Sequence, residues 1–172
     1  DANGRLLTTT DALGVSSGTK IFNVGNNTSI VEDIAGNQTS FHYDELGRVV
    51  KTVDALGNFT TTTYDGNGNV IARSDKLGRT TSYEYDALNR LIRSTNPEGG
   101  VTETFYDASG NRIATVDALD NTTTYEYDQF GQLIATTDPL GRVTRTEYDT
   151  YGRRTASIDA AGRRTTYTYD VL

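Results

Sequence analysis

The sequence predicts an all-β protein of tandem 21-residue β-hairpin repeats, which form a long, curved antiparallel sheet without helices. A Tyr-Asp pair recurs every 21 residues, and a fixed period of this length is typical of repeat architectures. Each period holds two turn signals with Asp first and Gly fourth, which suit tight turns. Between the turns lie runs of about six residues rich in Val, Ile, Thr and Tyr, which favour strands.

The repeats define the domain organisation as a single array over 1–172. Residues 1–43 form degenerate repeats, 44–169 form six regular repeats, and 170–172 begin a further one. Asn89 and Asn26 each replace a glycine of the first turn of a repeat. Asp120 breaks the glycine pattern of the second turns once. The predicted structural signature is Tyr43, Asp44, Gly47, Tyr64, Asp65, Gly68, Tyr85, Asp86, Tyr106, Asp107, Gly110, Tyr127, Asp128, Gly131, Tyr148, Asp149, Gly152, Tyr169 and Asp170.

Short strands joined by tight turns pair with their sequence neighbours, so we expect an antiparallel meander. About sixteen twisted strands cannot stay flat, and such a sheet must coil. A parallel β-solenoid with one coil per repeat is the structural alternative. It would stack the tyrosines along its axis.

The odd period makes a further prediction about faces. Side chains alternate with period two along a strand, so identical hairpin turns would place successive signature tyrosines on opposite faces. The recurrence of Thr four residues before each Tyr-Asp tyrosine, as at Thr81 and Thr102, indicates an unchanging environment. We therefore predict either two turns that differ by one residue or one β-bulge in each repeat. All signature tyrosines should then lie on one face.

Composition narrows the function classes. Apolar residues make up 35% of the 172 residues, which argues against a thick core, and the net charge of −7 disfavours nucleic-acid binding. No segment is long and apolar enough to span a bilayer, and there is no cysteine for disulfides or thiolate metal sites. The sequence is predicted to be a segment of a larger array, and no signal peptide is visible within it.

No pattern of residues predicts a catalytic, cofactor or metal site. Gly14–Gly18 matches a Gly-x-Ser-x-Gly nucleophile elbow, but it lacks a strand–turn–helix context, and the only histidine, His42, occupies a variable strand position. Asp65–Asn69 resembles the opening of a calcium loop, but Val70 and Lys76 stand where glycine and glutamate are needed. The remaining acidic residues recur as turn residues, whereas an active site needs one special pair.

The motif Tyr-Asp-x-x-Gly-Arg-[Leu/Val], seen at Tyr43–Val49, and Asp-Pro-Leu-Gly-Arg at Asp138–Arg142 resemble those of the Rhs, or YD-repeat, family. The resemblance covers almost the whole chain and implies hairpin repeats wound into a hollow shell. In bacterial members, including insecticidal toxin complexes, the shell holds a C-terminal toxin. In the animal teneurins it belongs to adhesion receptors.

The function implied is a non-enzymatic structural segment of a shell that encapsulates a toxin or other cargo. Its partners would be the rest of the parent shell and the cargo domain, in a protein that is secreted, displayed at the cell surface or delivered by a bacterial secretion system. The alternative function is a glycan- or cell-surface-binding adhesion module that uses the tyrosine ladder. Unpaired strand edges at 1–10 and 160–172 also predict end-to-end self-association.

Overall fold

The computed structural model describes residues 9–10, 16–17, 20–25, 27–33 and 35–170. The chain divides into two compact units, Asp1–Tyr83 and Glu84–Leu172, and the boundary falls inside strand β9 (Thr80–Tyr85). Every regular element in the described ranges is a strand, which confirms the all-β prediction. No described helix is long and apolar enough to cross a membrane.

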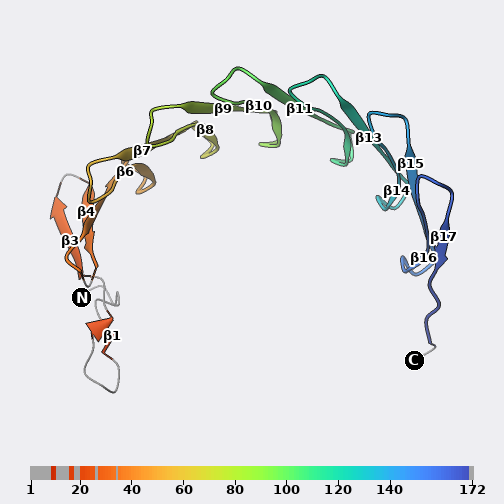
Figure 1. Cartoon of the computed structure of the whole chain (residues 1–172), viewed down its shortest axis with the longest axis horizontal. Helices are drawn as coiled ribbons and strands as arrows, with labels where there is room; N and C mark the ends of the chain where they lie inside the picture. Colours follow the sequence, from red (N-terminus) through yellow and green to blue (C-terminus); the bar gives the residue numbers. More distant parts are fainter. Residues whose placement is uncertain (1–8, 11–15, 18–19, 26, 34, 171–172) are drawn as a thin grey trace. The chain divides into compact units, whose positions relative to one another are not determined.

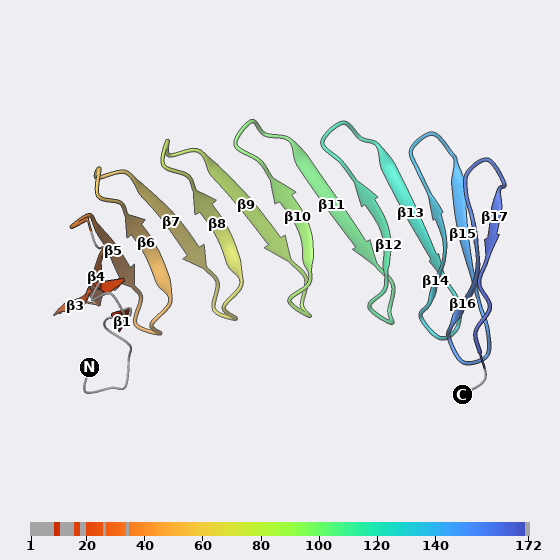
Figure 2. The same cartoon turned by 60° about the horizontal axis from the view of Figure 1, so that its bottom comes forward.

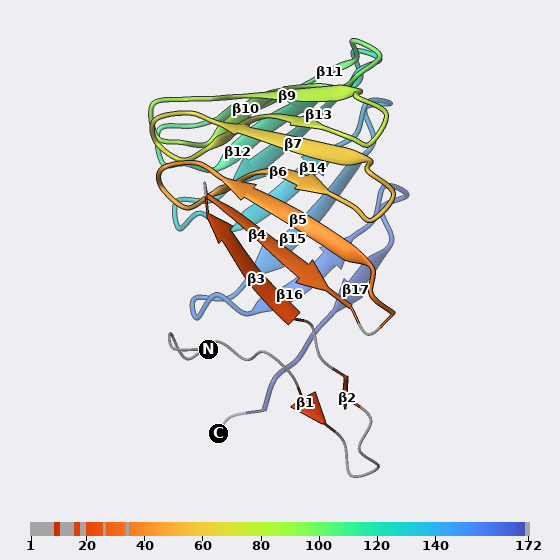
Figure 3. The same ribbon diagram turned by 90° about the vertical axis from the view of Figure 1, so that its left-hand side faces the viewer.

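In the first unit the strands pair in sequence order from β3 to β9, each antiparallel to its neighbour (Figure 3). β1 and β2 form a separate two-stranded pair. The strands before β9 are β1 (Thr9–Thr10), β2 (Ser16–Ser17), β3 (Lys20–Gly25), β4 (Thr28–Glu32), β5 (Gln38–Tyr43), β6 (Val49–Val53), β7 (Phe59–Tyr64) and β8 (Val70–Ser74).

The second unit repeats the same meander, and its strands β10 to β17 also pair in sequence order (Figure 1). Antiparallel pairing throughout both units excludes the parallel β-solenoid. The strands are β10 (Leu91–Thr95), β11 (Val101–Tyr106), β12 (Arg112–Val116), β13 (Thr122–Tyr127), β14 (Leu133–Thr137), β15 (Val143–Tyr148), β16 (Arg154–Ile158) and β17 (Arg164–Thr166).

The turns that follow Tyr-Asp lie at one edge of each unit, and the other turns lie at the opposite edge (Figure 2). Both kinds share one geometry. At Asp44 the backbone N–H donates to Arg48 O at 2.9 Å, and Gly47 N–H donates to Asp44 O at 3.0 Å. At Asp54 the corresponding bonds to Asn58 and from Gly57 are both 2.9 Å. The two turns therefore do not differ by a residue.

A register shift compensates for the odd 21-residue period, so that side chains return to the same face. This is the β-bulge alternative of the prediction. In the β7–β8 hairpin Thr63 pairs with Ala72 but Tyr64 pairs with Val70, which leaves Ile71 without a register partner. The same shift directly precedes the signature tyrosine at Tyr43, Tyr106, Tyr127 and Tyr148. The bulge prediction is confirmed, and it places equivalent residues of successive repeats on one face.

The sheet has almost no buried interior. Among residues whose burial is described, only Ser29, Ala135 and Ala156 are buried. Ala135 lies between its cross-strand neighbours Glu126 and Arg145, whose longer side chains flank the small methyl group. Because a thick core is absent, contacts between neighbouring hairpins must supply much of the stability. The low apolar content predicts this arrangement.

The fourth turn residue adopts a left-handed conformation. Glycine holds most of these positions, but Asn89 has φ 60° and Asp120 has φ 61°. Asn89 therefore substitutes for glycine as predicted. Asp120 departs from the glycine pattern in sequence but keeps the turn geometry, because Asp120 N–H still donates to Asp117 O at 3.0 Å. Asn26 lies outside the described residues.

Replacing Asp120 by glycine is expected to stabilise the second unit by about 0.5–1 kcal/mol, because glycine reaches the left-handed region without the Cβ penalty. Gly141 occupies the equivalent position one repeat later, with φ 75° and open space on the side where a Cβ would lie. Gly141→Asp should therefore lose a similar amount. Urea unfolding measures both changes. Equal stabilities for all three proteins would contradict the prediction.

Candidate functional site: a clasp between repeats

Each Tyr-Asp turn is organised by its aspartate. Asp44 Oδ1 accepts the backbone N–H groups of Leu46 at 3.0 Å and Arg48 at 2.9 Å, while Oδ2 accepts Arg48 Nε at 2.6 Å. Asp can bond its own backbone two residues on, which is why it favours this position. The carboxylate also accepts a side-chain group from the fifth turn residue at most described turns, so the turn is closed by both backbone and side chains.

These hydrogen bonds lower the pKa of the turn aspartates. At Asp44 the largest cause is the backbone N–H of Arg48; partial desolvation opposes it, and the Arg48 guanidinium adds to it. At Asp65 the largest cause is the side-chain amide of Asn69. The pKa is lowered in the same way at Asp33, Asp75, Asp86, Asp107, Asp117, Asp138 and Asp159. Each turn therefore favours the ionised carboxylate.

The arginine that closes one turn also contacts the next repeat. The Arg48 guanidinium carbon lies 4.5 Å from the centre of the Tyr64 ring, and Arg48 Nη1 donates to Asp65 O at 3.4 Å. Arg90 repeats this arrangement, with 4.5 Å to the Tyr106 ring. A cation over an aromatic face is attracted by the ring's quadrupole. One arginine thus joins the turn aspartate of its own repeat to the signature tyrosine of the following repeat.

The tyrosine hydroxyl completes this contact by bonding to the preceding hairpin. Tyr64 Oη donates to Val49 O at 3.2 Å, fifteen residues earlier. The same bond recurs at Tyr106, Tyr127, Tyr148 and Tyr169. Tyr43 differs, since its hydroxyl lies 2.9 Å from Ser29 Oγ. The recurring bond confirms the constant-face prediction at these five tyrosines, and it shows that their rings pack against a neighbouring hairpin.

We call this set of contacts the Tyr–Arg clasp: a turn aspartate, the arginine four residues later, and the tyrosine of the next repeat. It is complete at Asp44–Arg48–Tyr64, Asp86–Arg90–Tyr106 and Asp149–Arg153–Tyr169. A second row of stacked pairs lies further along the strands, where Arg112 is 4.5 Å from the Tyr125 ring and Arg154 is 4.3 Å from the Tyr167 ring.

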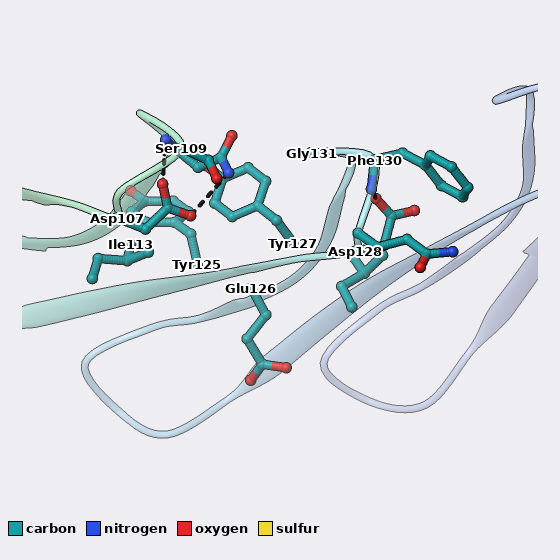
Figure 4. Close-up of a pocket in the computed structure, with 12 residues that line it drawn as sticks. Asp107, Ser109, Ile113, Tyr125, Glu126, Tyr127, Asp128, Phe130 and Gly131 are labelled. Carbon is teal, nitrogen blue, oxygen red and sulfur yellow. Dashed lines mark hydrogen bonds between the residues drawn. The ribbon is translucent and has the colours of Figure 1, made fainter.

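Where a shorter residue replaces the clasp arginine, an open groove remains between successive turns. Asn111 donates to Asp107 Oδ2 at 2.9 Å, but it has no guanidinium to stack on the next tyrosine. The groove there has a volume of about 740 Å³, with Tyr125, Tyr127 and Phe130 in its wall (Figure 4). Where Arg90 completes the clasp, the corresponding groove is about 380 Å³.

One ion pair joins turns of successive repeats at the opposite edge. The pKa of Asp54 is lowered to about 2, chiefly by the 2.6 Å hydrogen bond from Lys76 Nζ; desolvation opposes the shift and Asn58 adds to it. Lys76→Gln should raise the pKa of Asp54 towards 3.8, the ordinary value. A carboxyl-carbon NMR titration measures this. Lys51→Gln, which changes a lysine that stacks on Phe59, is the control, and an unchanged Asp54 in Lys76→Gln would contradict the prediction.

The remaining sequence candidates form no site. His42 lies in β5, with Nδ1 3.1 Å from Thr28 Oγ1, as a strand-face residue. Asp65 and Asn69 close a turn through a 2.9 Å side-chain bond. Gly14, Val15 and Gly18 of the elbow-like motif lie outside the described residues. In the described part, no three His, Asp or Glu side chains gather as metal ligands would.

The arginine belongs to the predicted Tyr-Asp-x-x-Gly-Arg motif, but the predicted structural signature of Tyr, Asp and Gly leaves it out and gives it no contact. The signal was present, because Arg48, Arg90 and Arg153 each stand four residues after the Tyr-Asp aspartate. What the sequence does not reveal is the residue that the guanidinium contacts across the repeat boundary. That contact depends on the strand register.

The hairpin array and its repeated turns define a tandem β-repeat protein. The RHS repeat family model matches residues 24–58, 64–101, 106–143 and 127–164, more than half of the chain. The chain belongs to the RHS repeat family. No curated protein sequence matches it.

Two solved structures share the fold. The crystal structure of TcdB2-TccC3-TEV is matched with a TM-score of 0.73 and 18% identity, over 92% of this chain and 10% of that one. The Photorhabdus luminescens Tc holotoxin pore, with a substitution in TccC3, is matched with a TM-score of 0.76 and 18% identity, over the same shares of the two chains. The chain therefore spans about a tenth of the length of these structures.

Proposed function

We propose that the chain is a non-enzymatic wall segment of an RHS shell that encloses a toxin or other cargo domain. The observation that supports the proposal is the Tyr–Arg clasp, which joins successive repeats at three described positions without a packed core. A wall made of one sheet layer needs such contacts, because no second layer covers it. The role of the Tyr, Asp and Gly residues is accordingly that of a structural repeat signature in a single array.

The rest of the parent shell and the enclosed domain would be the partners, in a protein that is secreted or delivered by a bacterial secretion system. Resistance of the cargo to protease tests this in the parent protein. Deleting residues 86–127, two whole periods, should shorten the wall and expose the cargo to cleavage. Cargo that is cut equally fast with and without these residues would contradict encapsulation. A panel of hydrolase substrates should show no turnover, and any turnover would contradict the non-enzymatic role.

A second proposal is glycan binding, for which the groove beside Asn111 is the specific support. Its wall holds the rings of Tyr125 and Tyr127, with Phe130 as a further lining residue at the turn, and aromatic faces stack on sugar rings (Figure 4). A glycan array should show saturable binding that Phe130→Ala removes. Leu140→Ala, at a turn outside this groove, serves as the control, because its side chain is equally exposed. Absence of binding at every glycan would contradict this role.

We also propose end-to-end self-association through the β17 edge. β17 pairs only with β16 in the described sheet, and all three of its residues are exposed. Tyr167 N–H donates to Thr155 O at 2.9 Å, so by alternation the N–H of Thr166 points away from β16. Light scattering should show association that grows with concentration and weakens in Thr166→Pro, which removes that donor. A strict monomer at high concentration would overturn this.

A further inference from the structure

Asp128 is an exception among the described turn aspartates. Its Oδ1 accepts the N–H groups of Phe130 and Gln132, both at 2.9 Å, as at the other turns. Its Oδ2, however, has no hydrogen-bond partner within the described part of the chain. At the Asp44, Asp86 and Asp149 turns this oxygen accepts the Nε of an arginine four residues later, at 2.6, 2.7 and 2.8 Å.

The fifth residue at this turn is Gln132, which does not replace the arginine. Its amide nitrogen lies 2.8 Å from where a Cβ on Gly152 would be, and at the complete clasps Arg48 Nη1 and Arg90 Nη1 approach the equivalent glycines, Gly68 and Gly110. The amide therefore takes up part of the guanidinium position. Within the described residues, this amide forms no hydrogen bond with the Asp128 carboxylate. The aspartate therefore keeps a carboxylate oxygen without a described partner, and the residue lines the groove shared with the following repeat.

The tyrosine of the clasp and the carbonyl that accepts the arginine in two complete clasps are both present at this position. Tyr148 donates its hydroxyl to Leu133 O at 3.2 Å, the bond that fixes the ring at the complete clasps. No described cation covers the Tyr148 ring. Asp149 O corresponds to the carbonyl that accepts Arg48 Nη1 at 3.4 Å and Arg90 Nη1 at 3.5 Å in the two earlier clasps. A groove of about 570 Å³ lies among Asp128, Gln132, Tyr148 and Asp149.

We propose that this groove is a binding site for a guanidinium group supplied by another molecule. The carboxylate oxygen, the tyrosine face and the carbonyl are the three features that hold a guanidinium in the complete clasps. A planar guanidinium fits them better than an ammonium, because it can donate to the carboxylate and the carbonyl while it stacks on the ring. The source is either a small guanidino compound or an arginine side chain of a polypeptide.

Two neighbouring charges bear on the affinity. Glu147 lines the groove, but its carboxylate is paired with the Arg164 guanidinium in a two-point contact. Arg145 also lines the groove and carries a like charge, which opposes an incoming cation. The site is open to solvent, where screening weakens the attraction. Binding in the millimolar range is therefore expected.

The probe is N-methylguanidinium, added to the isotopically labelled chain while NMR follows the Asp128 carboxyl carbon and the Tyr148 ring. Both signals should shift and saturate together, whereas N-methylammonium should bind at least threefold more weakly. A Gly-Arg-Gly peptide forms the second arm. Tighter binding of the peptide identifies a polypeptide arginine as the source, and equal or weaker binding identifies a small guanidino compound.

Variants at the fifth turn residue distinguish binding of the probe at this site from non-specific attraction of a cation to an acidic chain. Gln132→Ala removes the amide and should bind the probe severalfold more tightly. Gln132→Arg should complete the clasp, weaken probe binding at least tenfold and raise the thermal midpoint. Arg90→Gln is the matched control, since it should open a second site that Asp86 and Tyr106 report. Equal shifts at all turn aspartates, or unchanged binding in Gln132→Arg, would overturn the proposal.

Discussion

Acidification should destabilise both units, and the loss should begin as the pH falls below about 4. The pKa values of the turn aspartates are lowered in the folded chain from their ordinary value of 3.8, and that of Asp54 is lowered to about 2. A lowered pKa means that the unfolded chain binds protons more readily than the folded one. The stabilisation is therefore complete above 3.8 and is lost as the pH falls through the folded pKa values.

The effect should be large because many turns lose the same contact within one narrow pH range. Urea unfolding at a series of pH values between about 6 and 2 measures it, as a midpoint that stays level and then drops. Asp117→Asn provides the matched control, because an amide keeps an acceptor oxygen at this turn but does not titrate. Its midpoint should depend less on pH than that of the natural chain. A midpoint that rises on acidification would contradict the role assigned to the carboxylates.

Removal of one clasp tyrosine should have the largest effect of any single substitution considered. Tyr106→Ala deletes the ring under Arg90 and the 3.2 Å hydrogen bond to Leu91 O. The lost apolar contact, the cation–π contact and the hydrogen bond together are expected to cost about 2–3 kcal/mol. Urea unfolding of the 172-residue chain measures the difference.

Two controls show which part of the tyrosine matters. Tyr106→Phe keeps the ring and should lose only about 1 kcal/mol, the usual net contribution of one hydrogen bond. Tyr151→Ala removes a ring that is 83% exposed at a turn tip, and it should change the stability little. If Tyr106→Ala lost no more stability than Tyr151→Ala, the clasp would have no role in joining the repeats.

Much of the fold follows from the sequence, because the turn residues predict each hairpin and every strand pairs with its neighbours in sequence. Asp at the first turn position and Gly at the fourth predict each hairpin, and the odd period predicts a bulge once each face is required to stay constant. The position of that bulge did not follow. It lies on the returning strand, where Ile71 is left out of register, and the strand composition alone does not distinguish Ile71 from Val70.

The clasp was less predictable for a physical reason. A side chain as long as arginine reaches several neighbours, and which one it contacts depends on how two hairpins are aligned. Arg48 follows Asp44 closely in sequence, but its ring partner Tyr64 is sixteen residues away. Asp120 illustrates the opposite case. It departs from the glycine pattern, yet the backbone there adopts the same left-handed conformation.

The bulge in the hairpins of five signature tyrosines affects how such chains can change length. Because one period returns the chain to the same face, the gain or loss of 21 residues leaves the two faces of the remaining strands unchanged. A duplication or deletion by unequal recombination between two copies then joins compatible strands at the new junction. Gain or loss of a single hairpin strand would instead invert every later residue. The segment that can be duplicated or deleted without inverting the later strands is thus the whole hairpin with its bulge.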